Sequence, residues 1–507
     1  MASFQYFGAS LATIFSSPKF LLLIFAFTAL GILLGALPGV SVNMALILSL
    51  PLTYSMNSET AMAVLISCYI GALSGGLISA ITLNIPGTTS SIATTFDGSP
   101  MALRGEAGRA CGIGILTSFI GGCFSYVLLM FLAPLMGKVA LKFGGWEYFA
   151  IGMFSLAMII SIAGDDVWKG ILASTFGMAL AMTGPDPVSG IARYDFGISA
   201  LSGGITTTAL MCGIFAVPEL LKLAANREDA QAEDMEVEKF KGYGISAREL
   251  LLHWKNILRS SIIGTYVGVL PGVGASSASL ISYMTAKNSS KHPETFGKGD
   301  IDGIIASETA NNACMGGAMT PMLALGIPGS GATAILLSAL TLHNVQCGPL
   351  VFTKNASLIY FIFAICFVSN LVMVIVERVV LKGYIKVLTA PRRIVMVFVM
   401  MMCIIGAYSA RNSYTDIFVF IIGGVIGYAM KKAGVPTAPI LLGYILSAII
   451  EKNFIHAMQL SRGNYMDMFT RPIAVVFLIL AAISLFDSIR KTVKASKVRK
   501  AAELSQS

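Results

Sequence analysis

Charged residues are scarce in this sequence: Asp, Glu, Lys and Arg make up 12% of the 507 residues, and the mean hydropathy is +0.78. Because charged residues supply about 25% of a typical soluble domain, this composition excludes an ordinary globular protein. Uncharged runs such as Ala110 to Gly137 recur, and one bilayer crossing needs about 20 apolar residues. The sequence therefore predicts an all-α polytopic membrane protein with about 10 to 12 transmembrane segments in the lipid bilayer.

Several chemical signatures are also missing. The eight cysteines stand singly, without the paired spacing of a disulfide framework or a zinc site. No Gly-x-x-x-x-Gly-Lys-Ser/Thr motif is present, and no nucleophile, acid–base pair or metal cluster lies in the apolar runs, so we expect neither ATP hydrolysis nor an enzyme. The net charge of +9 gathers at the ends of apolar runs and in the tail Arg490 to Lys500, which favours a cytoplasmic tail over binding of nucleic acid.

The same landmarks appear in the same order in both halves of the chain. "GALPGVS" begins at Gly35 and "GVLPGVG" at Gly268, and the separation of later pairs rises steadily, as expected for a duplicated unit whose second copy gained loop residues. The later pairs are Gly75-Gly76 with Gly316-Gly317, Ile85 with Ile327, Lys138 with Lys382, and Gly177 with Gly427. We therefore expect two homologous repeats, inverted as in many transporters.

The predicted organisation follows from this duplication. It comprises an amphipathic lead-in at 1–18, a first membrane repeat at 19–222, a polar linker at 223–256, a second repeat at 257–487 and a basic cytoplasmic tail at 488–507. Three uncharged or nearly uncharged runs are too long for one crossing and must break, fold back or cross twice: Phe20–Ser58, Thr60–Phe96 and Thr309–Thr353.

Four Pro-Gly pairs predict where helices break. Irregular backbone at membrane depth survives only where protein or a water-filled cavity surrounds it, and a helix starting after the break points free N–H groups at an anion. We predict that substrate binds at re-entrant breaks formed by Asn84, Pro86, Gly87, Thr88, Thr89 and Ser90 in the first repeat and by Pro328, Gly329, Ser330, Gly331 and Thr333 in the second. Asn84 stands where the second copy has Gly326, so substrate contact is expected to favour the first loop.

Hard cations prefer oxygen ligands, and short polar side chains surround the breaks. The candidate Na⁺ ligands are Gly39, Ser41, Asn43, Gly272, Ser276, Glu308, Asn311 and Asn312. Because the run is free of acidic residues from Thr309 onward, we expect Glu308 near the polar edge of its helix, where ion or proton coupling competes with helix capping or folding support.

Other polar and small residues have a structural interpretation. The glycine pairs at 75–76 and 316–317, and "SFIGG" from Ser118, favour close helix packing. Asp97 and Arg104 follow the first loop and could contact an anionic substrate, although a membrane-surface turn is the stronger interpretation.

Five stretches resemble one known family. "LGALPGVSVNMALIL", "LNIPGTTSSIATTFDGSPMA", "GVLPGVGASSASLISYMT", "FGKGDIDGIIASETANNA" and "LALGIPGSGATA" are similar to the large membrane subunit of the tripartite tricarboxylate transporters, over about Gly31 to Arg471. The resemblance implies a multi-pass protein of the bacterial inner membrane that imports organic carboxylates with a coupling cation, a small membrane subunit and a periplasmic substrate-binding protein.

Two questions stay open at this point. Na⁺ is the expected coupling ion, with no covalent cofactor, but an H⁺-coupled or passive carboxylate permease or channel is an alternative. The uncharged "TTSSIATT" after the first loop supplies no Lys or Arg, so a dicarboxylate, monocarboxylate or aromatic acid fits as readily as a tricarboxylate such as citrate.

Overall fold

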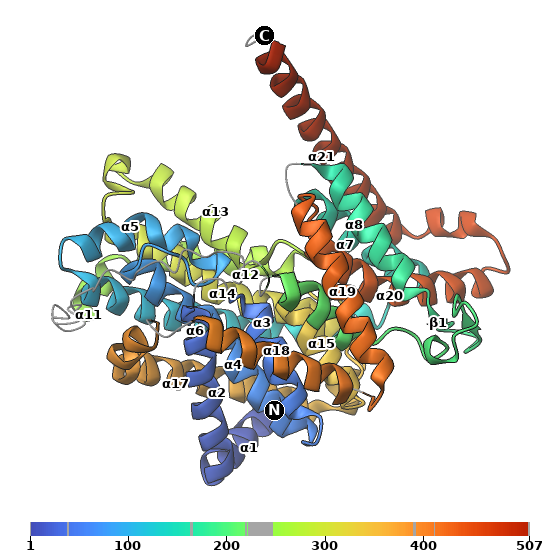
Figure 1. Ribbon diagram of the computed structural model, residues 1–507, viewed down its shortest axis with the longest axis horizontal. Helices are drawn as coiled ribbons and strands as arrows, with labels where there is room; N and C mark the ends of the chain where they lie inside the picture. The colour runs from blue at the N-terminus through green and yellow to red at the C-terminus, as the bar shows by residue number, and fades with distance from the viewer. Residues whose placement is uncertain are drawn as a thin grey trace. The chain divides into compact units, whose positions relative to one another are not determined.

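The computed structural model describes residues 2–37, 40–162, 166–218, 221, 247–388, 392–409 and 411–504. The described chain is almost wholly helical, apart from a two-stranded antiparallel sheet of β1 (Gly184–Pro185) and β2 (Ala192–Arg193). Two compact units share the chain: unit 1 holds 1–138, 219–269 and 273–410, and unit 2 holds 139–218, 270–272 and 411–507 (Figure 1). Each unit therefore contains segments from both halves of the sequence.

Unit 1 contains most of the predicted breaks. Its helices are α1 (Ala2–Ser16), α2 (Pro18–Ala36), α3 (Val42–Ser49), α4 (Ser58–Thr82), α5 (Ile92–Leu103), α6 (Ala107–Ala140), α11 (Ala247–Leu252), α12 (Trp254–Val269), α13 (Gly274–Ser289), α14 (Ile301–Leu325), α15 (Gly331–Leu342), α16 (Val351–Lys354), α17 (Ala356–Leu388) and α18 (Arg392–Ser409), with short 3₁₀ turns η1 (Leu50–Thr53), η2 (Thr89–Ser91) and η6 (Pro293–Thr295).

The three overlong runs are broken as the sequence predicts. The first is split between α2 and α3, the second between α4 and α5, and the third between α14 and α15. A residue in the left-handed conformation stands just after two of these helices. Gly326 follows α14 directly, with φ 75°, and Asn84 lies two residues beyond the end of α4, with φ 52°. Such a residue stops a helix because its backbone cannot continue the right-handed turn.

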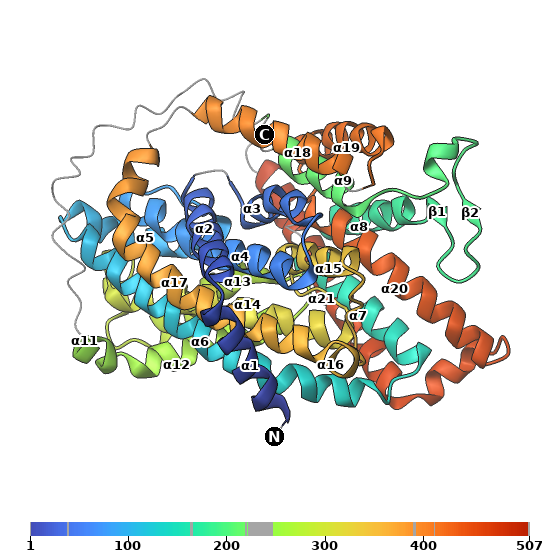
Figure 2. The same cartoon turned by 90° about the horizontal axis from the view of Figure 1, so that it is seen from below.

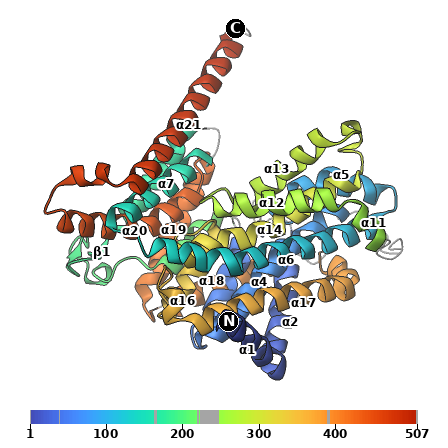
Figure 3. The same cartoon turned by 180° about the vertical axis from the view of Figure 1, so that it is seen from behind.

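Equivalent glycines make equivalent backbone contacts in the two halves. A Cβ added at Gly31 of α2 would fall on the Cys68 carbonyl of α4, and one added at Gly264 of α12 would fall on the Ala310 carbonyl of α14. In each half the two helices lie side by side (Figures 2 and 3). Two further pairs of contacts correspond. Gly35 meets Ala72 as Gly268 meets Cys314, and Gly75 meets Ile32 as Gly317 meets Thr265. Small residues allow this close approach of membrane helices, so α2–α4 and α12–α14 are the same packed pair built twice.

The equivalent helices α6 and α17 run antiparallel. Gly122 of α6 packs against Asn370 of α17, whereas Gly137, further along α6, packs against Phe352, which precedes α17. Lys138 of α6 and Lys382 of α17 are one of the repeated pairs, and an inverted repeat requires such equivalent helices to run in opposite directions.

Unit 2 consists of α7 (Gly145–Ile162), α8 (Val167–Ala181), α9 (Thr207–Met211) with a π-helical continuation at Cys212–Ala216, α19 (Tyr414–Lys432), α20 (Ala438–Leu460) and α21 (Pro472–Leu504), with 3₁₀ turns η3 (Ser199–Leu201) and η7 (Tyr465–Thr470). The repeat is visible here too, because Gly177 of α8 abuts the Ile440 carbonyl while its counterpart Gly427 of α19 abuts the Ile214 carbonyl.

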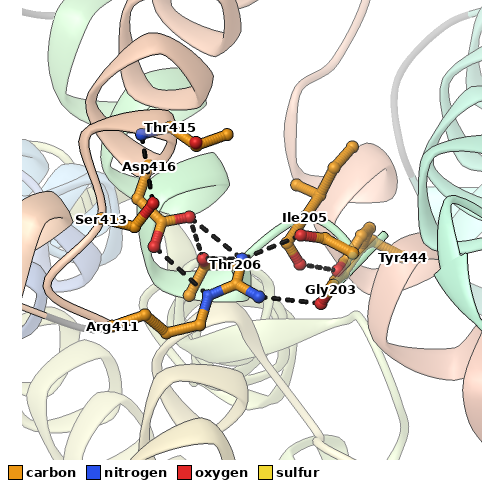
Figure 4. Close-up of polar contacts among 9 residues, drawn as sticks. Gly203, Ile205, Thr206, Arg411, Ser413, Thr415, Asp416 and Tyr444 are labelled. Carbon is orange, nitrogen blue, oxygen red and sulfur yellow. Dashed lines mark hydrogen bonds and ion pairs between the residues drawn. The ribbon is translucent and has the colours of Figure 1, made fainter. Parts of the chain in front are cut away.

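An ion pair ties the segment before α9 to the start of α19. Arg411 donates hydrogen bonds to the carbonyls of Gly203 and Gly204, at 2.8 Å each, and pairs with the buried Asp416 at 3.0 Å (Figure 4). Thr206 also donates to the Asp416 carboxylate. Arg411 is therefore occupied by structural contacts, and removing one partner would leave the other charge uncompensated.

Membrane-spanning character is spread over both units. Among the described residues, seven helices are long and apolar enough to cross a bilayer: α2, α4, α6, α17 through Val379, α19, α20 and α21 through Lys494. Five shorter apolar helices accompany them, at 42–53, 145–161, 167–181, 207–216 and 331–342. The lead-in forms α1, whose Tyr6 stacks on Tyr360 of α17, and the described part of the basic tail continues α21 to Leu504.

Candidate functional site

The first break of the first half lies beside the second break of the second half. Ser41 caps α3 by accepting from the Met44 amide at 3.2 Å, while Ser330 and Thr333 form a capping box at the start of α15. A Cβ added at Gly331 would lie 2.6 Å from Nδ2 of Asn43. We call this group of Ser41, Asn43, Ser330, Gly331 and Thr333 the α3–α15 junction.

The reciprocal pair of breaks meets in the same way. Ser276 of α13 donates to the Thr89 hydroxyl at 2.9 Å. Thr88 in turn bonds the hydroxyls of Ser90 and Ser91 at 3.0 and 3.2 Å. We call these five residues the α5–α13 junction, in which the Thr88 and Ser90 side chains are buried and Thr89 is exposed. The breaks thus form two junctions, each with one member from either half.

The Pro-Gly residues shape the breaks through backbone contact. Gly87 lies against the Gly35 carbonyl, and a Cβ added at its equivalent, Gly329, would lie 2.6 Å from the Gly268 carbonyl. Pro328 is buried and Pro86 half-buried. These four predicted site residues therefore place the junctions against α2 and α12, and a side chain at either glycine would force the backbones apart.

Asn84 has a conformational explanation. Its left-handed backbone matches that of Gly326 at the equivalent position, and its side chain is exposed. Asn and Gly are the residues that adopt this conformation most readily, so the two copies share one turn despite different side chains.

Glu308 is fully buried, which corrects the expectation of a polar-edge position. It lies two turns into α14, where α5 and α6 cover it. Thr94 of α5 donates to its Oε1, Ser118 of α6 to Oε2 at 3.2 Å, and Asn311 Nδ2 to Oε2 at 3.4 Å. The three donors favour the charged form of this carboxyl group, whereas its burial favours the neutral form.

Asn311 and Asn312 belong to the same cluster. Asn312 Nδ2 donates to Ser118 Oγ at 2.7 Å and to the Glu308 carbonyl at 3.2 Å, which orients the hydroxyl toward the carboxylate. Asn311 Nδ2 also reaches the Leu73 carbonyl of α4 at 3.2 Å. The structure therefore brings together three of the predicted cation ligands, which we call the Glu308 cluster, with Thr94, Ser118 and Leu73.

The other predicted cation ligands lie elsewhere. Ser41 and Asn43 belong to the α3–α15 junction, Ser276 to the α5–α13 junction, and Gly39 is outside the described residues. Gly272 has φ 82° and packs against Ile159 in unit 2. In the described part of the chain no three His, Cys, Asp or Glu residues gather, so a cation site here would combine one carboxylate with neutral oxygens.

Asp97 and Arg104 hold a loop. The buried Asp97 accepts three backbone N–H bonds at 2.8 Å, from Gly297, Gly299 and Asp300, and a fourth bond from the Tyr283 hydroxyl at 2.8 Å. Arg104 donates to two carbonyls of the same loop. These contacts fasten the segment before α14 to α5. Both residues have a structural role, but Asp97 is buried within α5 and does not lie in a surface turn.

Sequence reasoning missed three side chains of these sites. Thr94 and Ser118 contact Glu308, and the buried Tyr69 of α4 lies close to Ser330. Thr94 lies in the quoted "TTSSIATT" and Ser118 opens "SFIGG", but nothing in either string indicates a carboxylate more than 180 positions away.

An all-α membrane protein whose inverted halves break at paired, hydroxyl-rich helix ends has the architecture of a secondary transporter. Residues 21–442 match the sequence model described as the tripartite tricarboxylate transporter TctA family, and the chain belongs to this family. It is 35% identical, over 91% of its length and 92% of the relative's, to an uncharacterised 52.8 kDa protein of the TAR-I ttuC′ 3′ region of Agrobacterium vitis. A second Agrobacterium vitis protein, from the TAR-II ttuC′ 3′ region, is 36% identical over 45% of this chain and 96% of its own. No solved structure matches the chain.

Proposed function

We propose that this chain is the membrane subunit through which a tripartite system imports an organic carboxylate into a bacterial cell, driven by an inward Na⁺ gradient. The observation that carries the proposal is the assembly of the four breaks into two reciprocal junctions, each lined by hydroxyl groups and helix starts. Partial positive charge at helix N-termini stabilises carboxylates, and broken helices are where secondary transporters hold their substrates.

The coupling ion follows from charge balance. Glu308 is buried, and among the described residues no ion pair includes it. A buried carboxylate without a paired cation is costly, so a bound cation would offset the negative charge of Glu308. The negative charge of the substrate would need further cations or the positive ends of the helices at the junctions. H⁺ is the alternative coupling ion, and a mono-, di- or tricarboxylate is compatible with the uncharged junctions.

Membership of a tripartite family indicates partner subunits in general. We propose a small membrane subunit and a periplasmic substrate-binding protein as those partners, and the bacterial inner membrane as the location. A screen of the cognate binding protein against mono-, di- and tricarboxylates would identify the substrate.

The test is uptake of that radiolabelled carboxylate by proteoliposomes that contain the complete system. We expect accumulation only under an inward Na⁺ gradient, and expect that Thr88→Ala and Ser330→Ala each reduce uptake without loss of folded protein. Thr341→Ala is a matched control, because this exposed hydroxyl on α15 bonds only its own helix, at Leu337. Uptake that is independent of Na⁺ and driven by a proton gradient would show that the coupling ion is H⁺ and not Na⁺. Normal uptake by both junction variants would refute the proposed substrate site.

The left-handed turn at Asn84 predicts that two substitutions at this position reduce uptake to different extents. Asn84→Gly should retain uptake better than Asn84→Ala, because glycine accepts the positive φ and alanine resists it. Equal loss in both variants would instead indicate that the side chain contacts the substrate.

A further inference from the structure

We propose that an alkali cation binds between the Glu308 carboxylate, the Leu73 carbonyl and the side-chain oxygen of Asn311, and that the Asn311 amide nitrogen holds this position while the cation is absent. The inference rests on the proposed cation coupling and names the ligands of that ion.

The first observation is the position of the Asn311 amide nitrogen. It lies 3.2 Å from Leu73 O and 3.4 Å from Glu308 Oε2, so it sits between two oxygens from different helices. Both distances exceed the usual length of about 2.9 Å for an N–H···O hydrogen bond. An NH₂ group placed between a carbonyl and a carboxylate occupies the kind of position that a small cation fills in an oxygen cage.

The second observation is an unused oxygen on the same side chain. Asn311 is fully buried, and its Oδ1 has no hydrogen-bond partner. Buried polar atoms are nearly always paired, so this unpartnered oxygen is available as a ligand for a cation. Rotating the amide by about 180° exchanges oxygen and nitrogen, a motion about a soft terminal torsion.

After that rotation three oxygens converge on one position. Glu308 Oε2, Leu73 O and Asn311 Oδ1 would face each other, and Ser118 Oγ, 3.2 Å from the same Oε2, adds a fourth oxygen close by. Hard cations take such mixed sets of carboxylate, carbonyl and hydroxyl oxygens. One positive charge would then compensate the negative charge of Glu308.

The cluster occurs once in each chain although the fold is duplicated. The separation of 242 positions that relates α4 to α14 places Ile66 opposite Glu308 and Tyr69 opposite Asn311. The second half therefore supplies the carboxylate and the amide, whereas the first half supplies the Leu73 carbonyl and the Ser118 hydroxyl. We accordingly expect one such cation per chain.

The experiment measures ²²Na⁺ binding to the purified full chain without any carboxylate. We expect saturable binding by the wild type, loss of binding in Glu308→Gln, and a half-saturating Na⁺ concentration that rises about ten-fold or more in Asn311→Leu, because one oxygen ligand is lost. Asn311→Asp keeps an oxygen in place and should bind at least as tightly as the wild type, which guards against misfolding of the leucine variant.

Asn370→Leu is the matched control. Asn370 is also a buried asparagine with an unpartnered Oδ1, and its Nδ2 donates to Phe119 O at 2.9 Å, but it has no described contact with a carboxylate. Its loss should leave the half-saturating concentration unchanged.

The outcomes separate this inference from the proposed function. No saturable binding in the wild type, or unchanged binding in a folded Asn311→Leu protein, overturns the cation site even if uptake depends on Na⁺. Binding with the expected variant pattern supports the site even if uptake proves independent of Na⁺, in which case the coupling proposal fails alone.

Discussion

The most direct test of the duplicated packing is the replacement of Gly317 by alanine. A Cβ at this position of α14 would lie closer than 3.0 Å to the backbone of Thr265, and also close to Gly268, both on α12. Backbone cannot rotate away as a flexible side chain does, so the two helices must move apart.

The expected magnitude combines two opposing effects. Overpacking a close-packed contact costs about 1–3 kcal/mol, whereas alanine in place of glycine favours a helix by up to about 1 kcal/mol. The net destabilisation is therefore about 1–2 kcal/mol. Gly75→Ala should cost a similar amount, because Gly75 meets the Ile32 backbone of α2 in the equivalent contact.

Thermal unfolding in one detergent provides the assay. A thiol-reactive dye suits this chain, because its eight cysteines are free and six are buried, so unfolding exposes them. Gly114→Ala is the control, since a Cβ there would have only ordinary contacts, at 3.4 Å or more from Leu77. If Gly317→Ala and Gly75→Ala unfold at the same temperature as Gly114→Ala, the close backbone packing inferred here is wrong.

Two further predictions concern polar contacts of unit 1. Asp97→Asn replaces a charged acceptor of three backbone N–H bonds, so we expect faster limited proteolysis within 295–300 and little change in global unfolding; unchanged proteolysis would contradict the clamp. His253 donates a hydrogen bond from Nδ1 to the Asp302 carboxylate at 2.9 Å, and this bond raises the pKa of His253, although burial opposes the shift. Protonated His253 therefore stabilises the fold fully below its ordinary pKa, near 6.5, and this contribution is lost as pH rises through the raised value. The fall in the thermal midpoint over that window should shrink in His253→Gln and persist in His292→Gln; identical profiles would refute the pairing.

The sequence indicated where the chain breaks but not which breaks meet. Pro-Gly within an apolar run predicts local backbone, and the three overlong runs are indeed split. The contact between Ser276 and Thr89 joins residues 187 positions apart, and no local pattern encodes such a partner. Repeat symmetry was informative for packing, since the glycine contacts recur, but it could not show that the junctions are reciprocal.

Two side chains were harder to interpret for specific physical reasons. Glu308 stands just before the uncharged run that begins at Thr309, which places it near the polar edge in the sequence, whereas α5 and α6 cover it in the fold. Asn84 looks like a ligand because it is polar, yet its positive φ explains the residue without any ligand. The burial of a side chain depends on segments that are distant in sequence, and the φ angle depends on the local backbone. Residue type alone shows neither.

The inequality of the two halves bears on how ion and substrate could be coupled. Thr94 lies in the first turn of α5 and donates directly to Glu308, so the charge of this carboxylate is linked to the helix that starts at the α5–α13 junction. The α3–α15 junction has no such link, because its equivalent of Glu308 is Ile66 and its buried polar partner is the neutral Tyr69. On the function proposed above, an anionic substrate near α5 meets an uncompensated negative charge until the cation binds, and Coulomb repulsion in a low-dielectric interior is strong. Because of the Glu308 carboxylate, the cation would bind before the substrate. The two halves pack in the same way, but this difference between them would place the coupling site in one half of the fold only.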